Sequence, residues 1–201
     1  MSKRILDLDV ASTLSGASFV IAKEDVNEQV PAGELLGLLG FTINGAPLNL
    51  GMDFQSGTTL TVIFKQADGV TDPSVTNPIL IAFRDIDKTK GGYNIRSIST
   101  GLSATIPQGA TLGQASGVED DLYVYLMDTA GVIEPAFSGT DLGDSGWLTS
   151  TLLDTNSDSA SGIYSATPRT QSPFVKVARL VNTQAVAGTW AADPTQVWLA
   201  P

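Results

Sequence analysis

The stretch Leu-Tyr-Val-Tyr-Leu-Met-Asp, residues 122–128, is followed at once by Thr-Ala-Gly and indicates a β-strand that runs into a polar turn. Side chains alternate between the two faces of a strand. The two tyrosines, Tyr123 and Tyr125, therefore point to one face, and the leucines and the valine point to the other. Such a strand is expected where one face packs on its own sheet and the other meets another sheet or a second subunit.

The chain from Phe41 onward carries further β signals. Short apolar or β-branched runs are separated by Gly, Pro, Asn and Asp turns about every 8–15 residues, which is the spacing expected of a sandwich or barrel. We predict a mainly β body over residues 41–201, an antiparallel β-sandwich or jelly-roll-like domain, with a candidate sub-boundary near residues 100–118. The predicted strands are residues 58–65, 79–83, 93–99, 122–127, 131–136, 147–153, 163–166, 174–181 and 197–199.

Residues 1–40 differ from the body and form a predicted N-terminal attachment arm. Residues 19–21 and 26–30 are strand-like, and residues 31–40 predict a short helix with Pro31 in its first turn and Gly40 at its end. The arm has too few apolar residues for a core of its own, so we expect it to need a partner surface. The candidate attachment residues are Ile5, Leu6, Leu8, Leu14, Phe19, Val20 and Ile21.

The charge balance limits the partners of the chain. Its 201 residues include 21 acidic and 11 basic residues, which gives a net charge of −10. A negative surface repels phosphate backbones and anionic lipids, so we expect no nucleic acid partner. No run approaches the ~20 apolar residues of a membrane span, so we expect no membrane insertion. Acids interrupt the N-terminus before an apolar segment develops, so we expect synthesis in a cytoplasm without a secretory signal.

Two residue types that many catalytic and metal sites use are missing. The chain has no histidine and no cysteine, which excludes a Ser-His-Asp triad, a cysteine nucleophile and a thiolate metal site. Neither glycine-rich phosphate-binding motif occurs. We therefore predict a protein that is not an enzyme and that needs no cofactor or metal.

Two acidic clusters contain residue types found in metal and catalytic sites. Asp154-x-Asn156-x-Asp158 resembles the start of a calcium loop, but Ser159 and Ser165 replace the required Gly and Glu. We expect a solvated loop there. The run Glu119–Asp121 does not supply the two facing carboxylates of a glycosidase, and we interpret it as a charged loop that protects the following strand from aggregation.

Several tyrosines and tryptophans are candidates for a binding surface. Tyr123 and Tyr125 are candidate contacts to a second subunit or to a glycan, because a tyrosine ring offers an apolar face and a hydroxyl. Trp147, Trp190 and Trp198 are candidates for a glycan groove, although burial in a core or an interface is the favoured interpretation.

Two regions of the chain resemble bacteriophage virion proteins. The first resembles the N-terminal particle-attachment region of phage tail fibres and tailspikes. It comprises Lys3–Leu8, Leu14, Phe19–Ile21 and Pro31–Leu39. The resemblance implies that the arm attaches the protein to a particle.

The second region resembles a module of phage fibre and other virion-associated proteins. The resemblance implies a β-rich, often trimeric and non-enzymatic component without catalytic residues. It rests on Ile106–Gly113, Leu122–Tyr125, Tyr164–Arg169 and Thr183–Trp190.

The residues and the resemblance together favour a structural protein of a phage virion surface, a homotrimeric knob or short fibre. Its expected partners are copies of itself and other virion proteins. Capsid decoration or cement and a position on the tail remain alternatives, with the capsid slightly favoured because the chain has no shaft. The alternative function is a receptor-binding tail fibre module that grips a host surface glycan.

Overall fold

The computed structural model describes residues 19–23, 26–30, 47–87, 89 and 91–199. The chain consists of two units, residues 1–42 and residues 43–201. The described part of the first unit is an antiparallel hairpin of β1 (Phe19–Lys23) and β2 (Val26–Val30). The predicted arm helix and most of the arm lie outside the described residues.

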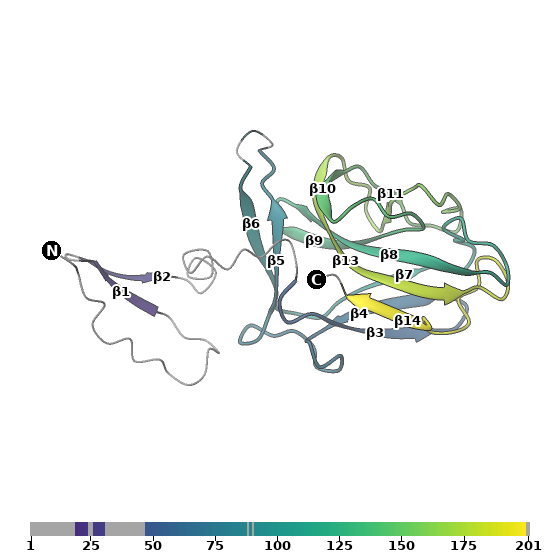
Figure 1. Cartoon of the computed structure of the whole chain (residues 1–201), viewed down its shortest axis with the longest axis horizontal. Helices are drawn as coiled ribbons and strands as arrows, with labels where there is room; N and C mark the ends of the chain where they lie inside the picture. Colours follow the sequence, from purple (N-terminus) through teal and green to yellow (C-terminus); the bar gives the residue numbers. More distant parts are fainter. Residues whose placement is uncertain (1–18, 24–25, 31–46, 88, 90, 200–201) are drawn as a thin grey trace. The chain divides into compact units, whose positions relative to one another are not determined.

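The second unit is mainly β, as the sequence predicts, and its antiparallel sheets form a curled, sandwich-like fold (Figure 1). No helix occurs in the described part of the chain. The strands of this unit are β3 (Gly51–Ser56), β4 (Leu60–Lys65), β5 (Ile79–Arg84), β6 (Tyr93–Ile98), β7 (Leu102–Ile106), β8 (Glu119–Thr129), β9 (Val132–Ser138), β10 (Ser145–Leu148), β11 (Thr151–Leu152), β12 (Tyr164–Ser165), β13 (Ser172–Thr183) and β14 (Gln196–Leu199).

A seven-stranded sheet is built around β8 and β13, the two longest strands. β9 pairs with the other edge of β8 and continues through β12 to β11. On the far side of β13, β10 pairs with the beginning of the strand and β14 pairs with its end. All of these pairings are antiparallel except that between β11 and β12.

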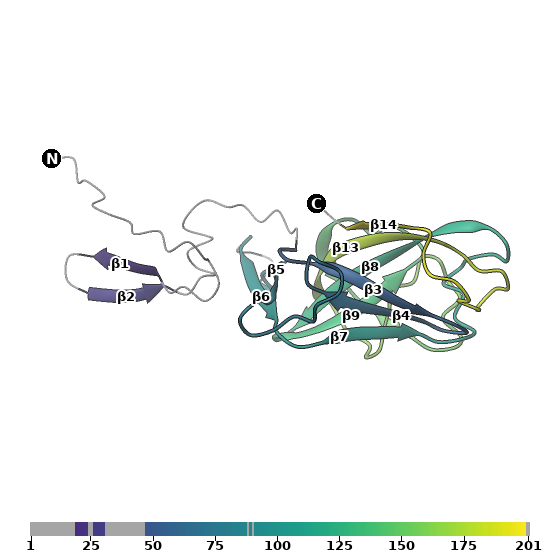
Figure 2. The same cartoon turned by 90° about the horizontal axis from the view of Figure 1, so that it is seen from below.

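A smaller sheet with the order β3-β4-β7 forms the second layer, and β5 and β6 form a separate hairpin (Figure 2). β3 and β7 were not predicted from the sequence. β3 contains Gly51, Asp53 and Gln55 among its apolar residues, and β7 alternates in a run of only five residues. Both strands have weak patterns because polar side chains occupy their outer face.

The main core lies between the two sheets. It takes inward side chains from every strand of the smaller sheet, from β5 and β6, and from β8, β9 and β13 of the larger sheet. Its largest fully buried members include Trp190, Phe64, Phe83 and Phe137. Burial of a large apolar side chain contributes roughly 1.5–3 kcal/mol, so this core dominates the stability of the fold.

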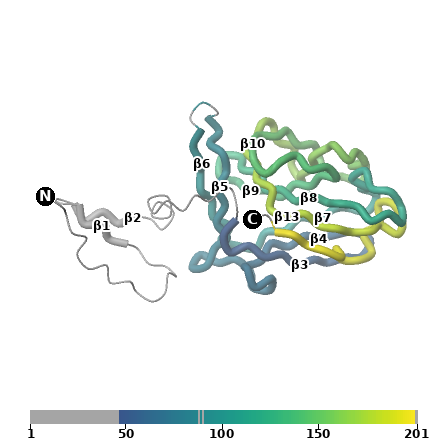
Figure 3. Tube along the Cα trace, in the orientation of Figure 1, coloured from purple at the N-terminus to yellow at the C-terminus, as the bar shows by residue number. Residues whose placement is uncertain are grey.

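A second, smaller core lies on the opposite face of β8, as the two-sided pattern of residues 122–128 predicts. Tyr125, Met127, Ala136, Ile163 and Phe174 form it. Residues 139–171, which include β10 to β12, cover this face; Figure 3 shows them in green. The second layer over β8 is therefore supplied by the same chain.

Candidate functional site

The two tyrosines predicted as contact residues lie on the same face of β8 but in different surroundings. Tyr125 is fully buried, and its ring meets Phe174 edge-on with 5.5 Å between ring centroids. Its hydroxyl accepts a hydrogen bond from the Leu142 N–H at 2.8 Å. Burial raises the pKa of Tyr125 above its ordinary value. Tyr125 therefore belongs to the second core of this chain and offers no surface to a ligand.

Tyr123 lies at the margin of the second core and is partly exposed. Its hydroxyl donates to Asp121 Oδ2 at 3.1 Å. Burial, and then the hydrogen bond to Asp121, raise the pKa of Tyr123. Of the two predicted tyrosines, Tyr123 is thus the one that reaches an open surface.

A row of side chains on neighbouring strands extends from Tyr123 over the outer face of the large sheet. Arg179 of β13 lies directly opposite Tyr123 on one side and Trp198 of β14 on the other. The Arg179 guanidinium lies over the Trp198 ring, with Cζ 4.8 Å from the ring centroid. Trp198 is 44% exposed. We call Asp121, Tyr123, Arg179 and Trp198 the ladder.

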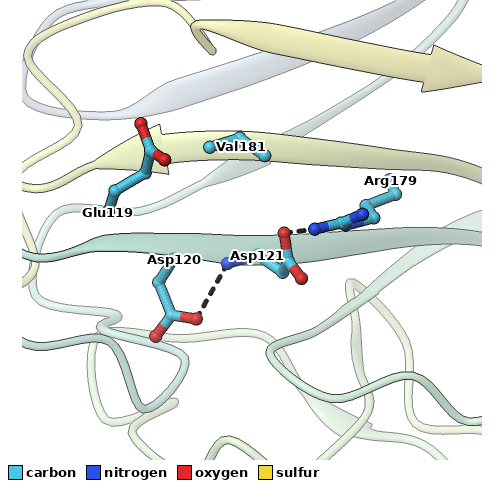
Figure 4. A pocket seen from close by; sticks show the side chains of 5 residues that line it. All are labelled: Glu119, Asp120, Asp121, Arg179 and Val181. Atoms are coloured by element: carbon cyan, nitrogen blue, oxygen red, sulfur yellow. Dashed lines mark hydrogen bonds and ion pairs between the residues drawn. The ribbon is translucent and has the colours of Figure 1, made fainter.

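The guanidinium of the ladder is held in place by a carboxylate. Arg179 Nε donates to Asp121 Oδ1 at 2.8 Å, as Figure 4 shows. The hydrogen bond to Asp121 raises the pKa of Arg179, while desolvation acts in the opposite direction. Because Asp121 also accepts from the Tyr123 hydroxyl, one carboxylate fixes the orientation of two neighbouring side chains.

An open depression of about 210 Å³ lies at one end of the ladder, lined by Glu119, Asp120, Asp121, Arg179 and Val181 (Figure 4).

The acidic residues Glu119, Asp120 and Asp121 belong to strand β8, so the prediction of a loop at Glu119–Asp121 is wrong. Asp121 and Val181 are cross-strand partners here, and so are Asp120 and Asn182. The pairing with β13 extends the strand beyond its apolar part.

A β-bulge in β13 puts Arg179 on the outer face. The register between β8 and β13 shifts between Lys176 and Ala178. Val177 and Ala178 consequently both contact the main core, and Lys176 and Arg179 both face outward although they are three residues apart. The sequence contains a signal of this bulge. Lys176 and Arg179 are three residues apart in an apolar run, so in a regular strand they would point to opposite faces.

The remaining tryptophans have structural positions. Trp190 is buried in the main core, and Trp147 of β10 is partly buried. Among the three tryptophans considered for a glycan groove, only Trp198 combines substantial exposure with a place in the ladder.

The acidic loop at Asp154–Asp158 forms local turns. Asp154 Oδ1 accepts from the Asn156 N–H at 2.8 Å, and the Asp154 N–H donates to Ser157 Oγ at 3.0 Å. These are the contacts of an Asx-type turn. Within the described residues, no group of three acidic side chains is arranged to hold a metal ion.

Of the predicted attachment residues, Ile5, Leu6, Leu8 and Leu14 lie outside the described residues. Phe19, Val20 and Ile21 belong to β1, where their backbone partners are Val30, Gln29 and Glu28 of β2. Their role in attachment stays a prediction.

Two of the segments that carry the phage resemblance, residues 106–113 and 183–190, meet in space. The Gly109 N–H donates to the Gly188 carbonyl at 2.8 Å. A Cβ on Gly188 would lie 2.8 Å from Gly109 Cα, and the φ angle of Gly188 is +75°. A glycine is therefore required at this crossing.

Buried polar side chains complete the contact between these segments. Gln114, Asn182 and Gln184 hydrogen-bond one another, with Gln114 Nε2 donating to Asn182 Oδ1 at 3.2 Å and Gln184 Nε2 donating to Gln114 Oε1 at 2.9 Å. The Trp190 indole N–H donates to the Ala110 carbonyl at 3.1 Å. A satisfied buried network of this kind specifies one arrangement of the two segments.

Comparison with known proteins gives one partial match. A family model described as the SecD/SecF GG motif matches residues 42–68, a short part of the chain whose described portion contains β3 and β4. No curated protein and no solved structure matches the chain. Within the described residues, no helix has the length and apolar character needed to cross a membrane.

Proposed function

We propose that this protein is a non-enzymatic structural component of a bacteriophage virion surface, a homotrimeric knob or short fibre. It is made in the host cytoplasm and resides on the virion. Its N-terminal arm attaches it to other virion proteins, and the β body projects from the particle. Between the two positions on the particle, we favour capsid decoration over the tail.

The observation that carries the proposal is the packing of the resembling segments against each other. Residues 106–113 and 183–190 are joined by the Gly109–Gly188 crossing and by the network around Gln114. These residues are thus used to build the body. This is the use expected if the resemblance reflects a shared structural module.

Two features of the chain agree with a role in assembly. The charged fraction is 16%, below the ~25% of typical soluble domains. The C-terminal edge strand β14 exposes Val197 and Leu199, each about two-fifths exposed. Weakly charged surfaces and apolar edges are features of proteins that bury surface in an assembly.

The experiment is to purify particles of the phage that encodes the chain and to image them with an antibody against the body. We expect the antibody to decorate the particle surface at regular positions, with a mass for the free protein three times that of one chain. Deletion of residues 1–30 should abolish incorporation while the body stays folded. Absence of the protein from purified particles would overturn the proposal, and unchanged incorporation of the deletion variant would overturn the role of the arm.

A further inference from the structure

We infer that the ladder on the outer face of the large sheet is a binding site for an uncharged saccharide. The inference goes beyond the structural role proposed above and does not depend on it. It rests on the spacing of the two aromatic residues across the sheet, on the polar groups fixed between them, and on the charge around them.

The spacing of the two aromatic residues suits a short sugar chain. Tyr123, Arg179 and Trp198 occupy directly opposed positions on three neighbouring strands. Adjacent strands lie about 4.8 Å apart, so the two aromatic residues at the ends are separated by about 10 Å. This span corresponds to two linked sugar rings. Each sugar ring has an apolar C–H face that packs on an aromatic side chain. On Trp198, this is the ring face that the Arg179 guanidinium leaves free.

Polar groups for the sugar hydroxyls lie between the two rings. Arg179 uses its Nε to bind Asp121, and a guanidinium carries four further N–H donors on its two Nη atoms. Asp121 supplies carboxylate oxygens that accept hydrogen bonds. Because the Asp121 contact and the Trp198 ring already hold the guanidinium, little side-chain freedom remains to be lost when a ligand binds.

The surrounding charge selects an uncharged ligand. Asp121 lies 2.8 Å from Arg179 and offsets its positive charge, and Glu119 and Asp120 line the adjoining depression. A ligand with carboxylate, sulfate or phosphate groups would approach an acidic rim on a protein of net charge −10. The site therefore fits neutral hexoses and N-acetylhexosamines better than sialylated or sulfated sugars.

The chain contains a matched control for the aromatic platform. Tyr93 of β6 is 44% exposed, the same fraction as Trp198, and Arg84 lies over its ring at 4.4 Å. This second stack belongs to the β5–β6 hairpin, on a different sheet from the ladder. Substitution of Tyr93 removes a similar exposed ring without touching the proposed site.

The test is a screen of the full-length protein against immobilised neutral oligosaccharides and against their sialylated and sulfated forms, followed by titration of any binder. We expect a neutral saccharide to bind and Trp198→Ala to weaken it about tenfold or more, which corresponds to ~1.4 kcal/mol. Tyr93→Ala should leave the affinity unchanged, and Trp198→Phe should retain most of it. Arg179→Gln, which changes an exposed side chain and retains both aromatic residues, should weaken binding as well.

Three results would overturn the inference. One is that no neutral saccharide binds, or that anionic forms bind more tightly. The second is that Trp198→Ala and Arg179→Gln bind as the wild type does while their thermal unfolding is unchanged. The third is that the wild type forms oligomers that Trp198→Ala dissociates, because the ladder would then be covered by a second copy of the chain.

Discussion

Tyr125 and Tyr123 are two residues apart on one face of one strand, yet one is part of a core and the other part of an open surface. Around Tyr125, residues 139–171 cover the sheet and complete the second core. Around Tyr123, the same face carries Arg179 and Trp198, and both are exposed. We refer to these as the covered half and the open half. The difference shows that residue type alone does not determine whether an aromatic residue on a strand is buried in a core or exposed at a surface.

Specific contacts hold the covering segment in place. The Leu142 N–H donates to the Tyr125 hydroxyl, and the Lys176 N–H donates to the Asp144 carbonyl at 2.7 Å. The Lys176 ammonium also pairs with Asp141 at 3.0 Å and with Asp144 at 2.8 Å. The covered half should therefore respond to substitution through stability, whereas the open half should respond through binding.

The largest expected contrast is between Tyr125→Ala and Tyr123→Ala. Removal of the fully buried Tyr125 ring leaves a cavity and should lower the free energy of unfolding by about 3–5 kcal/mol. Tyr123→Ala should cost less than about half of that, because Tyr123 is partly exposed. Urea unfolding followed by circular dichroism measures both. Equal losses would show that the two halves do not differ as described.

The second contrast concerns the fit of the covering segment. A Cβ on Gly139 would collide with the carbonyl oxygen of Leu112, while a Cβ on Gly101 would have no atom within 4 Å. We expect Gly139→Ala to destabilise the protein by about 1–3 kcal/mol, the usual cost of overpacking. Gly101→Ala should leave the midpoint of urea unfolding nearly unchanged. If Gly139→Ala left the free energy of unfolding unchanged, the covering segment would be able to shift and make room for the added methyl group.

The third contrast isolates the tyrosine hydroxyls. Tyr125→Phe keeps the ring and leaves the Leu142 N–H without its acceptor, which should cost about 1–2 kcal/mol. Tyr123→Phe should cost less, because water can replace a hydrogen bond at a partly exposed site. If the Tyr123 hydroxyl proved the more important of the two for stability, the assignment of the two halves would be reversed.

The smallest expected effect is that of the ion pairs of Lys176. The Asp141 and Asp144 side chains are 45% and 87% exposed, so Lys176→Met should cost less than about 1 kcal/mol at neutral pH. Although burial acts to raise it, hydrogen bonds from Lys176 and from the Gly143 N–H hold the pKa of Asp141 below its ordinary value. Burial lowers the pKa of Lys176, and its hydrogen bonds to Asp144 and Asp141 outweigh this and raise it.

These shifts fix the pH range of the effect. A lowered carboxyl pKa stabilises the fold above the unfolded value of about 4, and this contribution is lost as the pH falls through the folded value. A raised lysine pKa stabilises the fold below about pH 10.4, and this contribution is lost as the pH rises through the folded value. The stability difference between wild type and Lys176→Met should therefore become smaller both in acid and in alkaline solution. A difference that grew in acid would contradict the pairing.

The sequence predicted the strands because their patterns are local. The runs that became β4, β5, β6, β8, β9 and β13 are apolar or alternating and are bounded by turn residues. The two-sided stretch at residues 122–128 also predicted two apolar surroundings for β8, which the main and second cores confirm. What remained open was the source of the second layer, because a covering segment of the same chain and a second subunit require the same pattern.

The ladder was largely beyond prediction because it depends on pairing between distant strands. Tyr123 and Trp198 were recognised as candidates, but nothing local to either residue places Arg179 between them. The bulge near Val177 sets which side chains of β13 face outward, and a one-residue change of register reverses the faces of a strand. Asp121 was interpreted as part of a loop because its own residue type disfavours strands.

Labelling of single introduced cysteines tests the division of the face most directly, because the chain has no cysteine of its own. Met127→Cys places a thiol in the covered half, where Met127 is fully buried, and Trp198→Cys places one in the open half. In the folded full-length protein, we predict that a maleimide labels Trp198→Cys at close to the rate of the urea-unfolded protein and labels Met127→Cys at least about 100-fold more slowly. Rapid labelling of Met127→Cys in a folded protein would contradict the covered half, and strong protection of Trp198→Cys would contradict the open half.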